Sequence, residues 1–270
     1  GRVIDVGIAE AEAVASAAGM AYQGAHPVVA LYATFLNRGF DQLLMDVALH
    51  RAGVTFVLDR AGVTGADGAS HNGVWDIAMC SLIPGLRLAA PRDEQTLRAR
   101  LREALDVDDA PTVIRYRKGS LPEPMPALRS VGGVDILFDE AVADSRARVL
   151  IVGTGACAPD AIEAARRLAA DGVSVTVADP QWMIPICPDL ATLARDYDCV
   201  VSVEDGIVQG GFGWSLRDAV AETGVPVRCL GVPQGFPEHG DRAAMIAQFG
   251  FDADGIERAA RELVERIGER

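Results

Sequence analysis

The sequence predicts two α/β domains in series, each a doubly wound, mainly parallel sheet in a three-layer α/β/α arrangement. Its 270 residues suffice for two ordinary domains of this kind. Short apolar runs alternate with amphipathic stretches over residues 3–116 and again over residues 149–267. Because parallel strands need a helical return, this alternation is typical of βαβ units. The segment between the two blocks is rich in Pro and Gly.

The first domain is expected at residues 1–120. Apolar runs predict strands at residues 3–6, 27–33, 54–58, 86–90 and 112–116. Amphipathic stretches predict helices at residues 10–22, 37–51 and 94–105. Residues 59–85 break this rhythm and are rich in Gly, Asp and Asn. Long irregular segments inside a compact domain usually carry function, so we expect a functional loop here.

A linker is expected at residues 121–146, where Pro122, Pro124 and Pro126 favour a stiff, extended backbone. The second domain is expected at residues 147–270. Its predicted strands are at residues 149–152, 173–178, 199–203 and 225–232. Its predicted helices are at residues 159–170, 190–195, 213–221 and 255–267. The last helix has an apolar face with spacings of three and four residues, which should pack on the sheet.

Charge and cysteine content exclude several classes of function. With 25 Lys and Arg against 38 Asp and Glu, the net charge of −13 opposes non-specific binding to nucleic acid and to anionic membranes. The five cysteines show no CxxC spacing, so we expect reduced thiols in a cytoplasmic protein and no metal site. The chain enters an apolar run at once without an initiator Met, which indicates a cut inside a longer chain.

Three segments at predicted strand ends carry polar or aromatic groups that suit a site. They are Glu10 with its preceding turn, residues 32–42 and residues 59–73. Each also has a structural explanation, since Glu10 suits a helix first turn and Phe35 suits a core. The last segment is rich in Gly, which lets backbone N–H groups approach an anion, and His71 can exchange protons near neutral pH. Their convergence predicts a polar, anion-tolerant pocket at one sheet edge.

The same segments resemble the 1-deoxy-D-xylulose-5-phosphate synthase family. The family motifs read DVGIAEQHA, YSTFLQRAYDQ, DRAGxxGADGxTHxG and RYPRG, and the chain carries close versions of all four in this order. Residues 203–206 and 210–213 further resemble the family stretch VTxEDxxxxGGxG. The resemblance covers nearly all 270 residues and includes a transketolase-like carboxyl-terminal domain.

The resemblance implies a role for each matched residue. Glu10 would hydrogen-bond the aminopyrimidine of thiamine diphosphate, Phe35 would stack on that ring, and His71 would transfer protons or polarise a carbonyl. The implied substrate-binding residues are Tyr32, Arg38, Arg60, Asp67, His71 and Lys118. The implied reaction decarboxylates pyruvate and joins the two-carbon unit to D-glyceraldehyde 3-phosphate, in isoprenoid precursor biosynthesis. A cytoplasmic homodimer that uses Mg²⁺ is also implied.

Departures from the family pattern leave alternatives open. The family Gln-His after the catalytic Glu reads Ala11 and Glu12, and Glu12 would raise the pKa of Glu10 if both pointed inward. No GDG motif followed by Asn is present, so the Mg²⁺ and diphosphate ligands are expected in a missing amino-terminal part. The alternatives are a subunit of a split transketolase-like enzyme or of a ketoacid dehydrogenase, and a remnant without catalysis.

Overall fold

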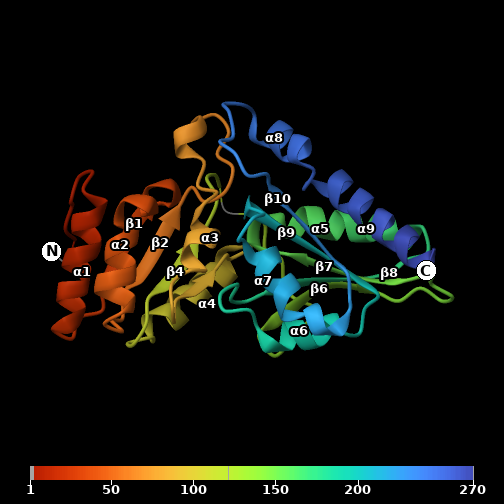
Figure 1. The fold of residues 1–270 in the computed structure, drawn as a ribbon, viewed down its shortest axis with the longest axis horizontal. Coiled ribbons are helices and arrows are strands. Elements are labelled where there is room, and N and C mark those ends of the chain that lie inside the picture. The colour runs from red at the N-terminus through yellow and green to blue at the C-terminus, as the bar shows by residue number, and fades with distance from the viewer. Residues whose placement is uncertain (1–2, 121, 270) are drawn as a thin grey trace.

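The computed structural model describes residues 3–120 and 122–269, which form two α/β units side by side (Figure 1). The first sheet has four parallel strands in the order β1-β2-β4-β3. Their bounds are Val28–Tyr32 for β1, Thr55–Asp59 for β2, Arg87–Ala89 for β3 and Thr112–Arg115 for β4. The parallel order confirms the predicted fold class for this half of the chain.

Helices of the first unit largely follow the predicted pattern. They are α1 (Glu10–Tyr22), the 3₁₀ turn η1 (Ala33–Gly39), α2 (Phe40–Gln42), the π-helical turn η2 (Leu43–Ala48), η3 (Ala69–His71), α3 (Asp76–Cys80) and α4 (Glu94–Leu105). The single helix expected at residues 37–51 is therefore a mixed helical segment that begins at Ala33. The short α3 lies within the region expected to be irregular.

The predicted strand at residues 3–6 is wrong. These residues have no regular secondary structure, and Val3 and Ile4 are 92% and 69% exposed. An apolar run becomes a strand only where a neighbouring strand offers backbone partners. In the part of the chain that the structure describes, no strand pairs with β1 on its far side from β2.

The second sheet has six strands in the order β10-β9-β7-β8-β6-β5. Their bounds are Arg129–Val131 for β5, Val134–Glu140 for β6, Arg148–Gly153 for β7, Ser174–Pro180 for β8, Cys199–Ile207 for β9 and Val227–Val232 for β10. The four strands from β10 to β8 are parallel, whereas β6 and β5 run antiparallel. The sheet is thus mainly parallel, as predicted.

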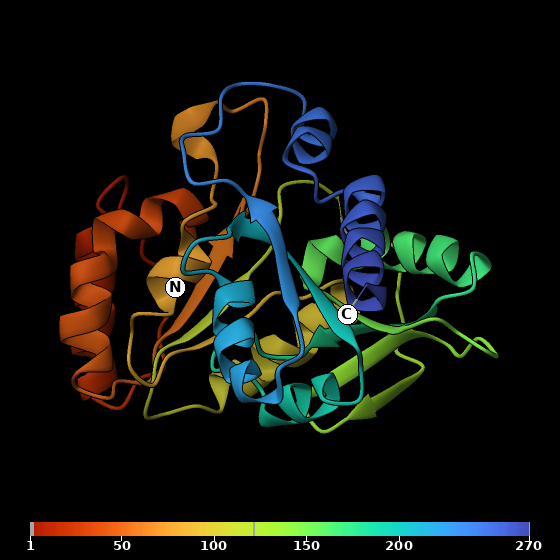
Figure 2. The ribbon, with the colours of Figure 1, turned by 45° about the vertical axis from the view of Figure 1, so that its right-hand side comes forward.

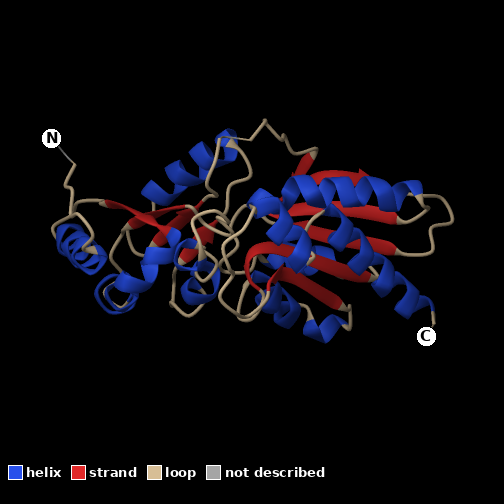
Figure 3. Ribbon diagram, turned by 90° about the horizontal axis from the view of Figure 1, so that it is seen from above, coloured by secondary structure: helices blue, strands red, loops and turns tan. Residues whose placement is uncertain are grey.

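Helices cover both faces of the second sheet (Figures 1 and 3). Its helical elements are η4 (Gly155–Cys157), α5 (Ala158–Ala170), α6 (Pro188–Ala194), α7 (Phe212–Ala219), η5 (Ala221–Thr223), α8 (Arg242–Phe249) and α9 (Ala253–Gly268). Helices α5 and α9 lie on one side and α6 and α7 on the other (Figure 1). The predicted apolar face of α9 is buried, with Ile256 and Ala260 fully inaccessible.

The segment expected as a linker contributes to the second sheet. Strands β5 and β6 form a hairpin through Gly132 and Gly133, in the register Val131 opposite Val134. Gly132 has a φ of 57°, a conformation that two-residue hairpin loops require and glycine adopts at little cost. The hairpin was not predicted, because the Pro- and Gly-rich composition of residues 121–146 favoured a linker. The Gly-Gly pair at its turn is nevertheless a common hairpin signal. The division of the chain into domains otherwise remains a proposal.

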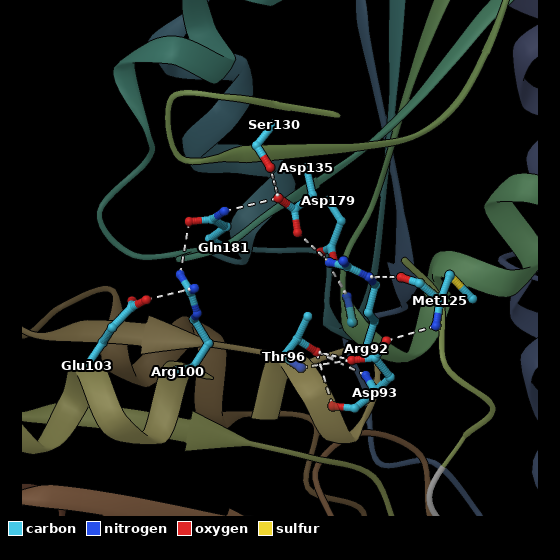
Figure 4. A network of polar contacts seen from close by, with 11 residues as sticks. Arg92, Asp93, Thr96, Arg100, Glu103, Met125, Ser130, Asp135, Asp179 and Gln181 are labelled. Atoms are coloured by element: carbon cyan, nitrogen blue, oxygen red, sulfur yellow. Dashed lines mark hydrogen bonds and ion pairs between the residues drawn. The ribbon is translucent and has the colours of Figure 1, made fainter. Parts of the chain in front are cut away.

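A buried network joins the two units (Figure 4). Arg92, which follows β3, contacts Asp135 on β6 at 2.8 Å and Asp179 on β8 at 3.0 Å. Its Nε also donates to the carbonyl of Met125 at 2.9 Å, and Asp93 accepts from the Met125 N–H at 2.8 Å. Because these side chains are buried and mutually bonded, the network holds the extended segment after residue 121 against both sheets.

Candidate active site

The carboxyl ends of three parallel strands meet at one edge of the first sheet. Tyr32 at the end of β1 is in register with Asp59 at the end of β2, and Leu58 is in register with Arg115 at the end of β4. Residues that follow these ends are therefore neighbours in space. Ligand sites in open α/β sheets occupy this position.

Aromatic and basic side chains cluster at this edge. The Arg60 guanidinium carbon lies 3.9 Å from the centre of the Tyr32 ring. The rings of Tyr32 and Phe35 are stacked at 6.0 Å, and His71 meets Phe35 edge-on at 5.5 Å. Four residues predicted from separate segments are thus in contact. Their exposed fractions are intermediate or high, so the cluster is open to a ligand.

Lys118 and Asp67 form an ion pair beside this cluster. The Lys118 Nζ donates to both carboxylate oxygens of Asp67, at 2.6 and 2.9 Å. The hydrogen bond from Lys118 lowers the pKa of Asp67, against a smaller opposing effect of burial, and Arg60 and His71 lower it further. The pair is solvent-exposed, so it costs little to separate when a ligand competes for Lys118.

Arg60 has an unusual backbone conformation. Its φ is 60°, in the left-handed region that non-glycine residues rarely adopt. Residues held in such conformations cluster at functional sites, where the surrounding structure compensates for the strain. The buried Nε of Arg60 has no hydrogen-bond partner among the described residues. An acceptor group on a ligand would satisfy this donor.

Asn72 holds the glycine-rich loop that carries Asp67 and His71. It is fully buried, and its Oδ1 accepts from the backbone N–H of Thr64 at 2.9 Å and of Gly65 at 3.3 Å. Its Nδ2 donates to the carbonyl of Gly68 at 3.1 Å. The side-chain amide of Asn72 therefore connects backbone groups at three positions of the loop. Asn72 was not among the predicted site residues, although it lies within the predicted segment 59–73.

The second unit also supports this loop. Residues 233–241 lie beside the loop at the top of Figures 1 and 2. The Gly240 N–H donates to the carbonyl of Gly65 at 3.4 Å, and the Arg242 Nε donates to the carbonyl of Val63 at 3.0 Å. Positioning of the loop therefore depends on both units, which sequence reasoning did not anticipate.

Arg115, at the end of β4, links the two units through two buried ion pairs. Its Nε donates to Asp76 at 2.7 Å and its Nη1 donates to Asp205 on β9 at 2.5 Å. Burial alone would lower the pKa of Arg115, but the two carboxylates raise it above its ordinary value. Burial likewise opposes ionisation of Asp205, yet Arg115 holds its pKa below the usual range. We call these three residues the Arg115 triad.

Glu10 and Arg38 make no hydrogen bond or ion pair with the cluster in the part of the chain that the structure describes, although Arg38 lies on η1 with Phe35. Glu10 is the first residue of α1. Its backbone carbonyl packs closely against Gly39, the residue after Arg38 on η1, because a Cβ added to Gly39 would lie 3.4 Å from the carbonyl oxygen. Glu10 is half-buried and Arg38 is exposed, and neither side chain forms a hydrogen bond or ion pair within residues 3–120 and 122–269. Glu12 is exposed and accepts a 2.7 Å hydrogen bond from Ser16. It therefore points away from the core rather than inward.

Comparison with known families assigns both halves of the chain. Residues 1–124 match the transketolase pyrimidine binding domain, and residues 140–256 match the transketolase C-terminal domain. The chain belongs to the transketolase family. The site at the strand ends thus lies in its pyrimidine-binding domain, and residues 233–241 and Asp205 belong to its C-terminal domain.

Curated relatives of this transketolase chain confirm the resemblance that the motifs indicated. It is 53% identical to a 1-deoxy-D-xylulose-5-phosphate synthase of Corynebacterium glutamicum over 95% of the chain. It is 52% identical to such a synthase of Kitasatospora griseola over 97% of the chain. The chain spans 41% and 42% of the length of these two relatives.

Solved structures show the same fold. One described as a "split gene transketolase, inactive beta4 tetramer" superposes with a TM-score of 0.83 at 27% identity, covering 98% of this chain and 84% of that chain. A transketolase from Leishmania mexicana superposes with a TM-score of 0.76 at 22% identity, covering 96% of this chain and 37% of that one. The transketolase-like arrangement of two parallel-rich units is therefore shared.

Within residues 3–120 and 122–269 no group of three or more His, Cys, Asp or Glu side chains is arranged to hold a metal ion. No helix in this part of the chain has both the length and the apolar character needed to cross a membrane.

Proposed function

We propose that this chain is the substrate-contacting part of a 1-deoxy-D-xylulose-5-phosphate synthase. The cluster of Tyr32, Phe35, Arg60 and His71 carries the proposal, because residues matched to the family motifs from separate segments are in contact. The 53% identity to a curated synthase supports it. Since the chain spans only 41% of that relative, the activity, substrates and partners belong to the whole protein.

Thiamine diphosphate is the proposed cofactor, and two residues of this chain fit its aminopyrimidine. Glu10 is half-buried at a helix start with a free carboxylate, and Phe35 offers an aromatic face of intermediate exposure. Glu10 would hold a proton at the ring nitrogen, and Phe35 would fix the ring plane. When bound, the cofactor supplies the electron sink for decarboxylation. Mg²⁺ and the diphosphate would be held by residues outside this chain.

Pyruvate and D-glyceraldehyde 3-phosphate are the proposed substrates. Arg60, with its unpartnered buried Nε, and the exposed Lys118 are cations suited to a phosphate or carboxylate group. Tyr32 and Arg38 would line the same space. His71 accepts or donates a hydrogen bond with Ser70 at its Nδ1, at 2.9 Å, which orients the ring for proton transfer at Nε2. Asp67, kept ionised by Lys118, would orient a substrate hydroxyl.

The decisive experiment replaces Glu10 by Gln in the full polypeptide that contains this chain. Formation of 1-deoxy-D-xylulose 5-phosphate from the two substrates should fall by roughly 10²–10⁴-fold, the usual effect of removing a general acid or base. Glu12→Gln is the matched control, because Glu12 lies two residues after Glu10, is exposed and accepts a hydrogen bond from Ser16. Near-normal product formation by Glu10→Gln, or an equal loss in both variants, would contradict the role of Glu10.

A split transketolase subunit is the second candidate. Its support is the structure described as a split gene transketolase, of which this chain covers 84%. Identity to that protein is 27%, against 53% to the synthase, and we therefore favour the synthase. The intact mass of the native polypeptide separates the two, since a single long chain supports the synthase and a chain of this length supports a subunit. A cytoplasmic homodimer is proposed by analogy with the synthase family.

A further inference from the structure

A cavity of about 270 Å³ lies between the two units, apart from the candidate active site. Both units line it, through the segment after β3, the start of α4, the segment after β4, η4 and the end of β9. The lining residues are Ala90, Pro91, Arg92, Asp93, Leu97, Arg115, Tyr116, Arg117, Gly119, Ser120, Pro122, Ala156 and Asp205. Part of this wall is visible around Arg92 and Asp93 in Figure 4.

Two arginine nitrogens in this wall are buried without a hydrogen-bond partner among the described residues. They are the Nη2 of Arg115, whose other two nitrogens hold Asp76 and Asp205, and the Nε of Arg117. Leaving a buried donor unsatisfied costs about 1–3 kcal/mol, and more for a charged group. Two cationic donors in the lining of one cavity therefore favour an occupant that supplies acceptor oxygens.

Among the remaining charged groups of the wall, Arg92 and Asp93 are engaged, whereas Asp205 Oδ2 is buried without a hydrogen-bond partner among the described residues. Arg92 contacts Asp135 and Asp179, and both carboxylate oxygens of Asp93 accept backbone N–H groups. The free Oδ2 of Asp205 is directed at Gly62, where an added Cβ would lie 2.1 Å from it. Arg117 has no ion pair among residues 3–120 and 122–269, so it is the uncommitted cation of the lining.

Charge and lining together define the occupant. Arg92 and Arg115 are each paired with two aspartates, which leaves Arg117 as the one cation of the lining without an ion pair among the described residues. One uncompensated cation suits an occupant with a single negative charge. The rest of the wall is largely apolar, from Ala90, Pro91, Leu97, Pro122 and Ala156. We propose that this interdomain cavity binds a small carboxylate with a compact apolar body, whose oxygens accept from Arg117 Nε and Arg115 Nη2.

This site is separate from the candidate active site, although the two are adjacent in sequence. Lys118 reaches Asp67 at the active-site edge, whereas the preceding Arg117 lines the cavity. Arg117 also stands where the family motif RYPRG has Pro, so the uncommitted cation is a feature of this chain. The carboxylate site therefore does not depend on the function proposed above.

The test titrates the full polypeptide with 4-fluorobenzoate, followed by ¹⁹F NMR, with 4-fluorobenzyl alcohol as the neutral probe of similar shape. Benzoate should bind saturably and the alcohol should not. Arg117→Ala should weaken benzoate binding roughly ten- to hundredfold, the effect of losing a charge-assisted hydrogen bond. Arg102→Ala is the control, because Arg102 is exposed on α4 outside the cavity and carries the same charge.

Lys118→Ala distinguishes this site from the active site. Unchanged benzoate affinity in Lys118→Ala supports the cavity, whereas a loss there with normal binding by Arg117→Ala would overturn it. Equal binding of the alcohol, or displacement of benzoate by an equal concentration of inorganic phosphate, would overturn the assignment to a carboxylate. Arg117→Lys keeps the charge but lacks Nε, so weakened binding in this variant as well would support a hydrogen bond from that atom.

Discussion

Replacing Arg115 by Met tests whether the Arg115 triad joins the two units. The arginine side chain is 3% exposed and contacts Asp76, 0% exposed, at 2.7 Å and Asp205, 2% exposed, at 2.5 Å. Met keeps the unbranched apolar part of the side chain without the guanidinium, so it leaves two buried carboxylates without a cation. Removing one partner from a buried ion pair costs about 3–5 kcal/mol, a large part of the roughly 5–15 kcal/mol that stabilises a folded domain.

The pH dependence of this loss provides a second test. In the variant, burial without a cation raises the pKa of both carboxyl groups above the ordinary value of about 3.9. The folded state then binds protons that the unfolded state has released, so the variant becomes more stable as pH falls from 7 toward 4. In the unmodified chain, burial raises the pKa of Asp76 despite Arg115, whereas Arg115 holds the pKa of Asp205 low. The stability from Asp205 is therefore lost as pH falls. The difference between the two proteins should therefore shrink in acid.

The assay is urea unfolding at pH 7 and pH 5, with the midpoint and slope both fitted. Arg102→Met serves as the control, because its exposed position predicts a change within about 0.5 kcal/mol. The reasoning would be refuted if Arg115→Met lowered the free energy of unfolding by less than about 1 kcal/mol, equally at both pH values. Buried carboxylates without a cation should destabilise the fold by more than this.

Three further predictions follow from the site and its supports. Burial raises the pKa of Glu204 to about 7, against hydrogen bonds from two backbone N–H groups, so its contribution to stability declines as pH rises from about 4.3 to 7. Glu204→Gln should flatten part of this decline in urea unfolding, and an unchanged profile would contradict the assignment. Gly62→Ala should cost clearly more stability than Gly68→Ala, because both have positive φ but only the first Cβ would meet Asp205; equal losses would contradict this. Lys118→Ala should raise the KM for the phosphorylated substrate while leaving the unfolding midpoint nearly unchanged, because Lys118 is exposed. An unaltered KM in steady-state kinetics of the full polypeptide would contradict substrate binding by Lys118.

Local signals were sufficient for most elements. The bounds predicted for α4, residues 94–105, match the structure, because Asp93 and Thr96 form a capping box that defines where the helix begins. The bounds of α1 were likewise predicted. The strands predicted at residues 27–33 and 54–58 differ from β1 and β2 by one residue at each end. For each helix, the interactions that set its bounds join residues only a few positions apart along the chain.

Candidate site residues were predicted less completely, because a motif names residues without their partners. The motifs supplied Tyr32, Phe35, Arg60 and His71, and the structure brought these into one cluster. The sequence did not reveal that Arg60 is left-handed and lies over Tyr32, since both follow from how two strand ends are juxtaposed. Glu10 and Arg38 form no hydrogen bond or ion pair with these residues among the described part of the chain, so their roles stay predictions from the motifs.

Local patterns in the sequence were enough to predict the alternation of strands and helices, the resemblance to a family, and the segments that carry polar groups. Tertiary structure alone decided that residues 3–6 form no strand, that β5 and β6 join the second sheet, and that Arg115 pairs with a residue 90 positions away. The physical reason is that helices and caps depend on neighbours along the chain, whereas strand pairing and buried charge depend on partners that only folding brings together.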